Sequence, residues 1–253
     1  MKICFLGSGT SQGIPVIGCK CDVCKSLDSK DKRLRSSVWI EHKGQSFVID
    51  TSADFRQQML RENVEKLDFV LLTHAHKDHI AGMDDVRSFN HLQHKPMNIY
   101  TDHRTCEAVM TEFHYAFSFN PYPGVPQLNL IPIENQSFTV ENIEIVPISV
   151  IHFHLPILGF RIADFAYITD ASYIDEKELE KMNGLKLLII NALRIDKHYS
   201  HFNLEEAIRI SDKLKPQKTI FTHIGHQMGK YADINPTLPP TMELAYDQML
   251  IEI

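Results

Sequence analysis

Short apolar runs bounded by turn residues recur along the whole chain, and their length is that of β-strands. They are rich in Val, Ile and Phe, which favour extended structure. The pattern predicts strands over residues 2–7, 36–42, 45–51, 68–74, 97–102, 143–150, 158–162, 165–170, 185–190, 218–223 and 249–253. The second and third of these runs predict a hairpin that turns at Lys43 and Gly44.

Helical spacing appears in four of the intervening segments, at residues 54–62, 103–117, 175–182 and 203–213. The last of these begins with a capping box, because Asn203 is followed three residues later by Glu206. Many strands with helices between them predict a mixed α/β architecture in which helices cover sheets.

Composition narrows the class of protein. The chain has 253 residues, a hydrophobic fraction of 43% and a net charge of −6, so it can bury a sizeable core and does not have the basic character of a nonspecific nucleic-acid binder. No apolar run is long enough for a signal peptide or a membrane span. We therefore expect a soluble cytoplasmic protein.

The segment "LLTHAHKDH" places four ligand-type side chains at the end of an apolar run. On a continuous strand His74 and His76 project to the same side, and Asp78 and His79 follow as the chain leaves the strand. Imidazole and carboxylate ligands together suit Zn, Mn or Fe(II). Four ligands exceed what one open catalytic site uses, so the motif favours two neighbouring metals over a polar turn rich in His by chance.

Three of the five cysteines lie in one loop with the spacing C-x-C-x-x-C, at Cys19, Cys21 and Cys24. Structural zinc takes four ligands in a tetrahedron, so a fourth Cys or His must come from elsewhere. The candidate is His226, which follows His223 by three residues in "HIGH". The alternative is a group of reduced surface thiols, which oxidise readily.

The motif H-x-H-x-D-H after an apolar strand resembles the signature of the metallo-β-lactamase fold hydrolases, and the resemblance runs from Gly7 to the end of the chain. It implies an αββα sandwich of two mixed sheets flanked by helices, formed as a single domain over residues 1–253. Later strand ends offer the remaining ligands of that family, at His152, Asp170 and His223.

The resemblance implies a division of the ligands between two metals. One metal would be held by His74, His76 and His152, the other by Asp78, His79 and His223, with Asp170 bridging them. His154 competes with His152, because on a continuous strand it would point to the same face; the spacing to Leu155 favours His152. The two divalent cations would carry four positive charges, and two aspartates and a bridging hydroxide would carry three negative ones. The site would keep one net positive charge, which favours an anionic substrate.

The cysteine loop "GSGTSQGIPVIGCKCDVC" and the second histidine of "HIGH" are similar to those of the PhnP-type phosphodiesterases. That resemblance implies a structural zinc on Cys19, Cys21, Cys24 and His226. It also implies a substrate among cyclic ribosyl or nucleotide phosphodiesters, and a homodimer. Quinone-cofactor biosynthesis proteins of the same fold have a related cysteine loop.

Two further residues are expected at the site. The resemblance implies that His201, just before a helix, contacts the substrate phosphate or protonates the leaving group, whereas the alternative is an exposed loop histidine. Asp78 is expected to act mainly as a metal ligand, with proton transfer as a secondary role. Asp50 is expected to orient a metal-bound histidine.

The resulting prediction is a dinuclear metal-dependent phosphodiesterase acting on a small substrate, with no membrane and no stable nucleic-acid partner. Its rivals are a transfer-RNA 3′ endonuclease, a thioesterase, a secreted β-lactamase and a non-hydrolytic quinone-pathway protein. The sequence shows no basic inserted arm of the kind that a transfer-RNA endonuclease carries. It also shows no export signal, which a secreted β-lactamase would need. We expect specificity to come from loops over 84–96 and 117–127.

Overall fold

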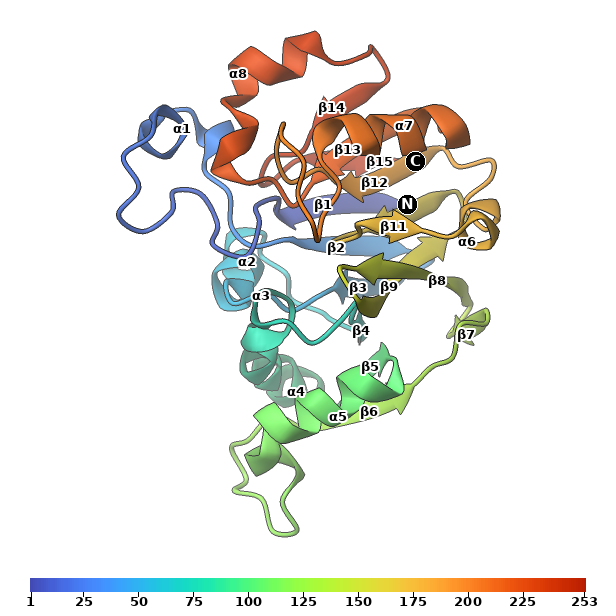
Figure 1. Cartoon of the computed structure of the whole chain (residues 1–253). Helices are drawn as coiled ribbons and strands as arrows, with labels where there is room; N and C mark the ends of the chain where they lie inside the picture. The colour runs from blue at the N-terminus through green and yellow to red at the C-terminus, as the bar shows by residue number, and fades with distance from the viewer.

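Two β-sheets lie face to face in the computed structural model, which describes all 253 residues (Figure 1). The first sheet has the order β15 (Leu250–Glu252), β1 (Lys2–Gly7), β2 (Ser37–His42), β3 (Gln45–Ile49), β4 (Phe69–Leu71), β5 (Met97–Thr101) and β6 (Leu128–Pro132). The second has the order β11 (Tyr173–Ile174), β8 (Ile143–His152), β9 (Leu155–Ile162), β10 (Phe165–Ile168), β12 (Leu187–Asn191), β13 (Lys218–Thr222) and β14 (Met242–Leu244), and β7 (Phe138–Val140) pairs with β8.

Both sheets are mixed, as predicted. Strands β3 to β6 pair in parallel, whereas β15, β1, β2 and β3 pair antiparallel. In the second sheet β8, β9 and β10 pair antiparallel, and β10, β12, β13 and β14 pair in parallel. Parallel strands deliver the residues that follow them to one edge of a sheet, where the ligands of α/β proteins gather.

Helices cover the outer faces of both sheets. The α-helices are α1 (Asp22–Lys25), α2 (Phe55–Arg61), α3 (Lys77–Ile80), α4 (Arg87–Gln93), α5 (His103–Glu112), α6 (Glu176–Glu180), α7 (Leu204–Leu214) and α8 (Tyr231–Ile234). Short 3₁₀ turns are η1 (Ser29–Asp31), η2 (Ala81–Val86), η3 (His114–Phe117), η4 (His226–Met228) and η5 (Asn235–Thr237). Helix α7 lies against β12 and β13 of the second sheet and α5 against β6 of the first, toward opposite ends of the molecule in Figure 1, which confirms the αββα sandwich.

The hydrophobic core consists of three layers, one between the two sheets and one between each sheet and its covering helices. Between the sheets the ring of Phe47 stacks on that of Phe69 at 4.4 Å, and Phe160 and Tyr167 reach them from the second sheet. A second cluster lies between the second sheet and helices α6 and α7, and a third between the first sheet and helices α2, α4 and α5. Burial of each large side chain stabilises the fold by about 1.5–3 kcal/mol.

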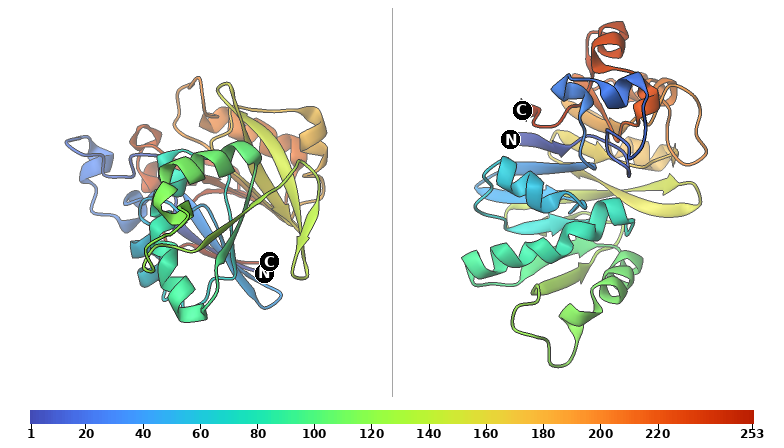
Figure 2. Two further views of the ribbon diagram at one scale, coloured as in Figure 1. Left: turned by 90° about the horizontal axis from the view of Figure 1, so that it is seen from below. Right: turned by 90° about the vertical axis from the view of Figure 1, so that its left-hand side faces the viewer.

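The ends of the chain meet at one side of the first sheet. Strands β1 and β15 pair antiparallel, and the Met1 amino group donates to the Ile253 carbonyl at 2.6 Å. Both termini therefore lie side by side, as Figure 2 (left) shows. No helix combines the length and the apolar composition that a bilayer crossing requires.

The segment between β1 and β2 forms a long loop that carries the cysteines. In Figure 2 (right) this blue segment lies beside the red segment that contains α8. The backbone N–H of Tyr231 donates to the buried Asp31 carboxylate at 2.7 Å, and the Lys30 ammonium lies 4.2 Å from the centre of the Tyr231 ring. The loop is thus fixed against the C-terminal third of the chain.

Several sequence expectations need correction. Residues 84–96 are not a specificity loop: most of them belong to η2 and α4, and Phe89 packs in the core. The helix expected over 103–117 ends at Glu112 and is followed by a 3₁₀ turn. The hairpin at Lys43 and Gly44 is confirmed, and both residues have the positive φ that such a turn requires.

Candidate metal centres

The side chains of the histidine motif do come together, but strand alternation, which was expected to align them, is not the cause. Strand β4 ends at Leu71, so His74 and His76 lie in a loop and strand alternation does not align them. Their rings still meet, with Nε2 of His74 3.0 Å from Nδ1 of His76. Helix α3 then begins at Lys77 and turns Asp78 and His79 back toward the same point, where both are buried.

Strand ends of the second sheet bring the remaining candidates to this point. Asp170 follows β10 and His223 follows β13, whereas His152 is the last residue of β8. Asp50, Asp170 and His223 all adopt a left-handed backbone, with φ of 68°, 60° and 55°. Non-glycine residues held in this region cost about 1–3 kcal/mol each and cluster at functional sites.

The candidate ligands form two groups that share Asp170. One group is His74, His76, His152 and Asp170; the other is Asp78, His79, Asp170 and His223. In each group one ligand atom from every residue lies within 4.8 Å of the others. The structure therefore brings together all seven residues that the resemblance divided between two metals.

The charge distribution at this point suits bound cations. Asp50, Asp78 and Asp170 are buried, and their ion pairs involve histidines and no Lys or Arg. Buried charges are ordinarily paired or coordinate metals. In addition, Nε2 of the fully buried His79 has no hydrogen-bond partner.

Burial shifts the protonation of most histidines toward the form that binds metal. It lowers the pKa of His74 well below its ordinary value, and it also lowers the pKa of His76 and His223. Neutral imidazole is the ligand form. For His79 burial acts in the same direction, but Asp78, Asp170 and Asp50 together raise its pKa well above the ordinary value.

Outer contacts hold two of these rings in place. His79 Nδ1 donates to the Asp50 carboxylate at 2.7 Å, as expected for Asp50, and the Thr73 backbone N–H and hydroxyl donate to that same carboxylate. His152 Nδ1 donates to the Ser200 carbonyl at 2.8 Å. Such partners fix the tautomer and orientation of ligating histidines. Sequence reasoning missed Thr73 and Ser200, because loop Ser and Thr residues carry no distinguishing pattern.

Of two further histidines near the site, His201 lies beside the ligand groups and His154 does not. His201 is buried, its ring centre lies 4.6 Å from that of His152 and 5.0 Å from that of His223, and Nδ1 has no partner. His154 is exposed and belongs to neither ligand group. Strand β8 ends before it, so the expectation that it shares a strand face with His152 is wrong.

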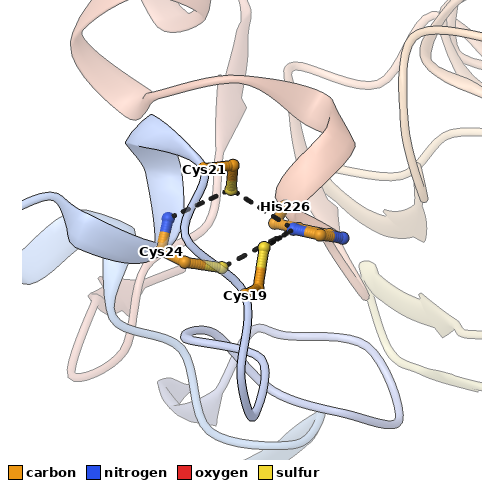
Figure 3. Close-up of side chains that lie close together, drawn as sticks. All are labelled: Cys19, Cys21, Cys24 and His226. Atoms are coloured by element: carbon orange, nitrogen blue, oxygen red, sulfur yellow. Dashed lines mark hydrogen bonds between the residues drawn. The ribbon is translucent and has the colours of Figure 1, made fainter.

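The cysteine loop forms a third group, and its side chains point toward one another in Figure 3. The Sγ atoms of Cys19, Cys21 and Cys24 lie 3.3, 3.4 and 3.5 Å from His226 Nδ1. A tetrahedral zinc with Zn–S of about 2.3 Å and Zn–N of about 2.0 Å separates sulfur from nitrogen by about 3.5 Å. The spacing of these four atoms therefore fits a zinc ion.

Thiol acidity in this group depends on local contacts. The Cys24 backbone N–H donates to Cys21 Sγ, and this contact together with His226 lowers the pKa of Cys21 to about 6. Burial raises the pKa of Cys24 to about 11. Cys4 and Cys106 are buried and lie outside the group, as expected. The structure brings the four residues together, so three unrelated surface thiols are not what is found.

Comparison with known proteins agrees with this geometry. A family model described as the Beta-lactamase superfamily domain matches residues 45–224. A crystal structure described as a new diphosphatase from the PhnP family has a TM-score of 0.93 and 37% identity, over 99% of this chain and 96% of that chain. Zn²⁺-bound PqqB from Methylobacterium extorquens has a TM-score of 0.80 over both full chains, but its 17% identity shows the fold alone.

Curated relatives carry mixed names. An octanoyltransferase of Porphyromonas gingivalis is 38% identical over 250 residues, which are 98% of this chain and 50% of that protein. The coenzyme PQQ synthesis protein B of Methylococcus capsulatus is 26% identical over 57% of this chain and 50% of that protein. The chain thus spans about half the length of the curated relatives it matches, and their names do not identify the activity of the matched half.

The family assignment rests on the matched model and on the PhnP-family structure, which is similar over nearly its whole length. Both agree with the αββα sandwich. The chain belongs to the β-lactamase superfamily and is a PhnP-like hydrolase of the metallo-β-lactamase fold.

Proposed function

We propose that residues 1–253 act as one hydrolase domain, a dinuclear metal-dependent phosphodiesterase of small nucleotide or ribosyl phosphodiesters. The observation that carries this proposal is the pair of ligand groups that share Asp170. Zn, Mn or Fe ions held by these two groups would supply Lewis-acid charge and a water whose pKa falls to about 7.

The protein's own residues position the reaction. Asp50 and Ser200 hold the rings of His79 and His152, so these ligands present their lone pairs in fixed directions. The left-handed backbone at Asp170 directs its carboxylate to both groups. Apart from the exposed His76, the ligand candidates are buried, which strengthens the electrostatic attraction for a phosphoryl group.

His201 is proposed to stabilise charge on a phosphoryl oxygen. It lies against both ligand groups, and burial lowers its pKa to about 3, so it is neutral near pH 7 and donates through N–H. This state favours a hydrogen-bond donor over a proton donor to the leaving group. Asp78 remains a ligand first, because histidines hold its carboxylate ionised.

The cysteine group is proposed to hold a structural zinc that fixes the N-terminal loop against the catalytic turn. His226 begins η4, three residues after His223, so one short turn joins the two centres. The fold has three hydrophobic layers of its own, so zinc is not needed to form the core.

A diphosphate bond is the second candidate for cleavage. The PhnP-family protein that is 37% identical to this chain is described as a diphosphatase. In both reactions water would displace one of two substituent oxygens on phosphorus, an ester oxygen in a phosphodiester or the bridging anhydride oxygen in a diphosphate, so the same residues serve either. The transfer-RNA alternative has a structural neighbour at 19% identity, which supports the fold only. The quinone-pathway alternative has a structural neighbour at 17% identity and a curated relative at 26% identity that matches only 57% of this chain.

A substrate panel tests this proposal. We expect the metal-loaded protein to hydrolyse bis(4-nitrophenyl) phosphate or a diphosphate diester, and to leave a thioester and a precursor transfer RNA intact. A chelator is expected to abolish the activity. Hydrolysis of the thioester alone would overturn the assignment.

The same panel tests His201. Replacing it with alanine is expected to lower kcat/KM by about 10²–10³, equally for aryl and alkyl leaving groups, since one donor to the phosphoryl oxygen is lost. His91→Ala, at an exposed position on α4, is the matched control. A loss that grows with the pKa of the leaving group would instead make His201 its proton donor.

A further inference from the structure

A hollow of about 480 Å³ opens beside the first ligand group and is not used by the chemistry described above. His76 and His152 form its inner wall, while Phe153, Leu155 and Tyr199 extend it outward. Its volume falls within the roughly 300–1,000 Å³ typical of small-ligand sites. Whatever occupies it therefore lies next to the reacting phosphorus.

Two aromatic side chains are exposed at this hollow. Phe153 is 51% exposed and Tyr199 is 74% exposed, and their ring centres lie 5.4 Å apart in an edge-to-face arrangement. The rings of neighbouring histidines extend the surface, because His154 lies 3.7 Å from Phe153 and His198 stacks on Tyr199 at 4.4 Å. These four rings lie next to one another at different tilts, so a planar ligand can contact the face of one ring and the edge of another; we call them the aromatic rim.

The backbone at Phe153 is strained. Its φ is 59°, in the left-handed region that glycine adopts freely and that a bulky side chain adopts only at a cost. The strain persists because the Phe153 N–H donates to the Ser172 hydroxyl, which itself donates to the Ile151 carbonyl. An exposed phenyl group adds little to folding, so its retention at a glycine-type position indicates a role at the site.

The loop that presents Tyr199 is also braced. The Arg194 guanidinium donates to the carbonyls of Asp196 and Lys197, and the Asn203 side chain donates to the Ile195 carbonyl. The rim is therefore held in place before any ligand binds, which lowers the entropic cost of binding.

We propose that the aromatic rim binds a nucleobase, so that the substrate is a nucleoside phosphoester or diphosphate ester instead of a base-free ribosyl phosphate. This inference rests on the proposed function, because it places the base beside the phosphorus that is cleaved. Stacking of a base on aromatic side chains contributes about 1–3 kcal/mol and tolerates different bases. Tyr199 and His154 are exposed, and a phenol hydroxyl and an imidazole can hydrogen-bond to the polar edge that a base, unlike an alkyl chain, presents.

The test compares two esters that differ only in the base. The 4-nitrophenyl ester of thymidine 5′-phosphate and its abasic analogue release the same phenol, so any difference in kcat/KM reports the base. We expect the wild-type protein to prefer the thymidine ester about tenfold or more, as the stacking energy implies. In the Phe153→Gly/Tyr199→Ala variant we expect this preference to fall to about twofold, and because it is a ratio of the two esters, any effect common to both cancels.

Two measurements separate a binding role from a structural one. Calorimetry on the same proteins should show thymidine 5′-monophosphate binding more tightly than 2-deoxyribose 5-phosphate, and only in the wild type. Phe153→Gly alone should not lower the melting temperature, because glycine relieves the strain. Tyr122→Ala, which removes an exposed tyrosine from another loop, should retain the base preference.

Each outcome decides a different claim. Equal rates for both esters in the wild type, or a preference that survives the double substitution, would overturn the rim as a base site while leaving phosphodiester hydrolysis intact. Hydrolysis of neither ester, nor of any phosphodiester in the panel, would overturn the proposed function itself and the rim assignment with it.

Discussion

Replacing Asp170 with asparagine is expected to lower kcat/KM for a phosphodiester by about a thousandfold or more. Asp170 is the one residue common to both ligand groups: its Oδ1 lies 3.1 Å from His223 Nδ1 and 3.4 Å from His79 Nε2, and its Oδ2 lies 3.8 Å from His74 Nε2. Burial opposes its ionisation, but His223 and His79 hold its pKa well below the usual range. The amide removes the shared negative charge, and with it several kcal/mol of transition-state stabilisation.

The substitution preserves shape, so its effect is expected in the chemistry. Asparagine is close in size to aspartate, and Asp212→Asn on the exposed side of α7 gives a control with the same change of charge. Steady-state kinetics and circular dichroism on both variants make the comparison. Activity of the Asp170 variant within about tenfold of wild type would contradict a bridging role.

Cys24→Ser is expected to remove about one zinc ion per chain and to lower activity more than stability. The Cys24 thiol lies 3.5 Å from His226 Nδ1 and also accepts the Val16 backbone N–H. Loss of the ion frees the turn that carries His223, for which we expect roughly a tenfold drop in kcat/KM, as for other supporting contacts of metal sites. The melting temperature is expected to fall by only about a few degrees.

Elemental analysis of the purified variant gives the first readout. Cys106→Ser is the matched control, since Cys106 is a buried cysteine outside the group and its loss should leave zinc content unchanged. Unchanged zinc in Cys24→Ser would remove the structural zinc from the account. A loss of zinc with full activity would separate it from the catalytic turn.

Local pattern was sufficient for the ligands that lie close together in the chain. His74, His76, Asp78 and His79 fall within six residues, so any compact turn brings them together. His152, Asp170 and His223 come from three other strand ends, and only the resemblance to a family indicated them. The zinc group spans 202 residues between Cys24 and His226, a distance that no local pattern reports.

The main strands were predictable because their apolar runs are buried on both faces. The elements that the sequence did not predict are short or weakly apolar. Strands β6, β7 and β14 have three to five residues, and Phe89 is the single buried hydrophobic residue of α4. Their structure comes from pairing with neighbours, which tertiary context decides. The left-handed residues Asp50 and Phe153 were also beyond prediction, since strain appears only in the fold.

The central claim is that two cations lie side by side at Asp170, and anomalous X-ray diffraction at the Zn, Mn and Fe edges tests it most directly. We predict two peaks about 3.5–4 Å apart on either side of the Asp170 carboxylate. A single peak at this point, or none among these histidines and aspartates in protein purified without chelator, would contradict the account.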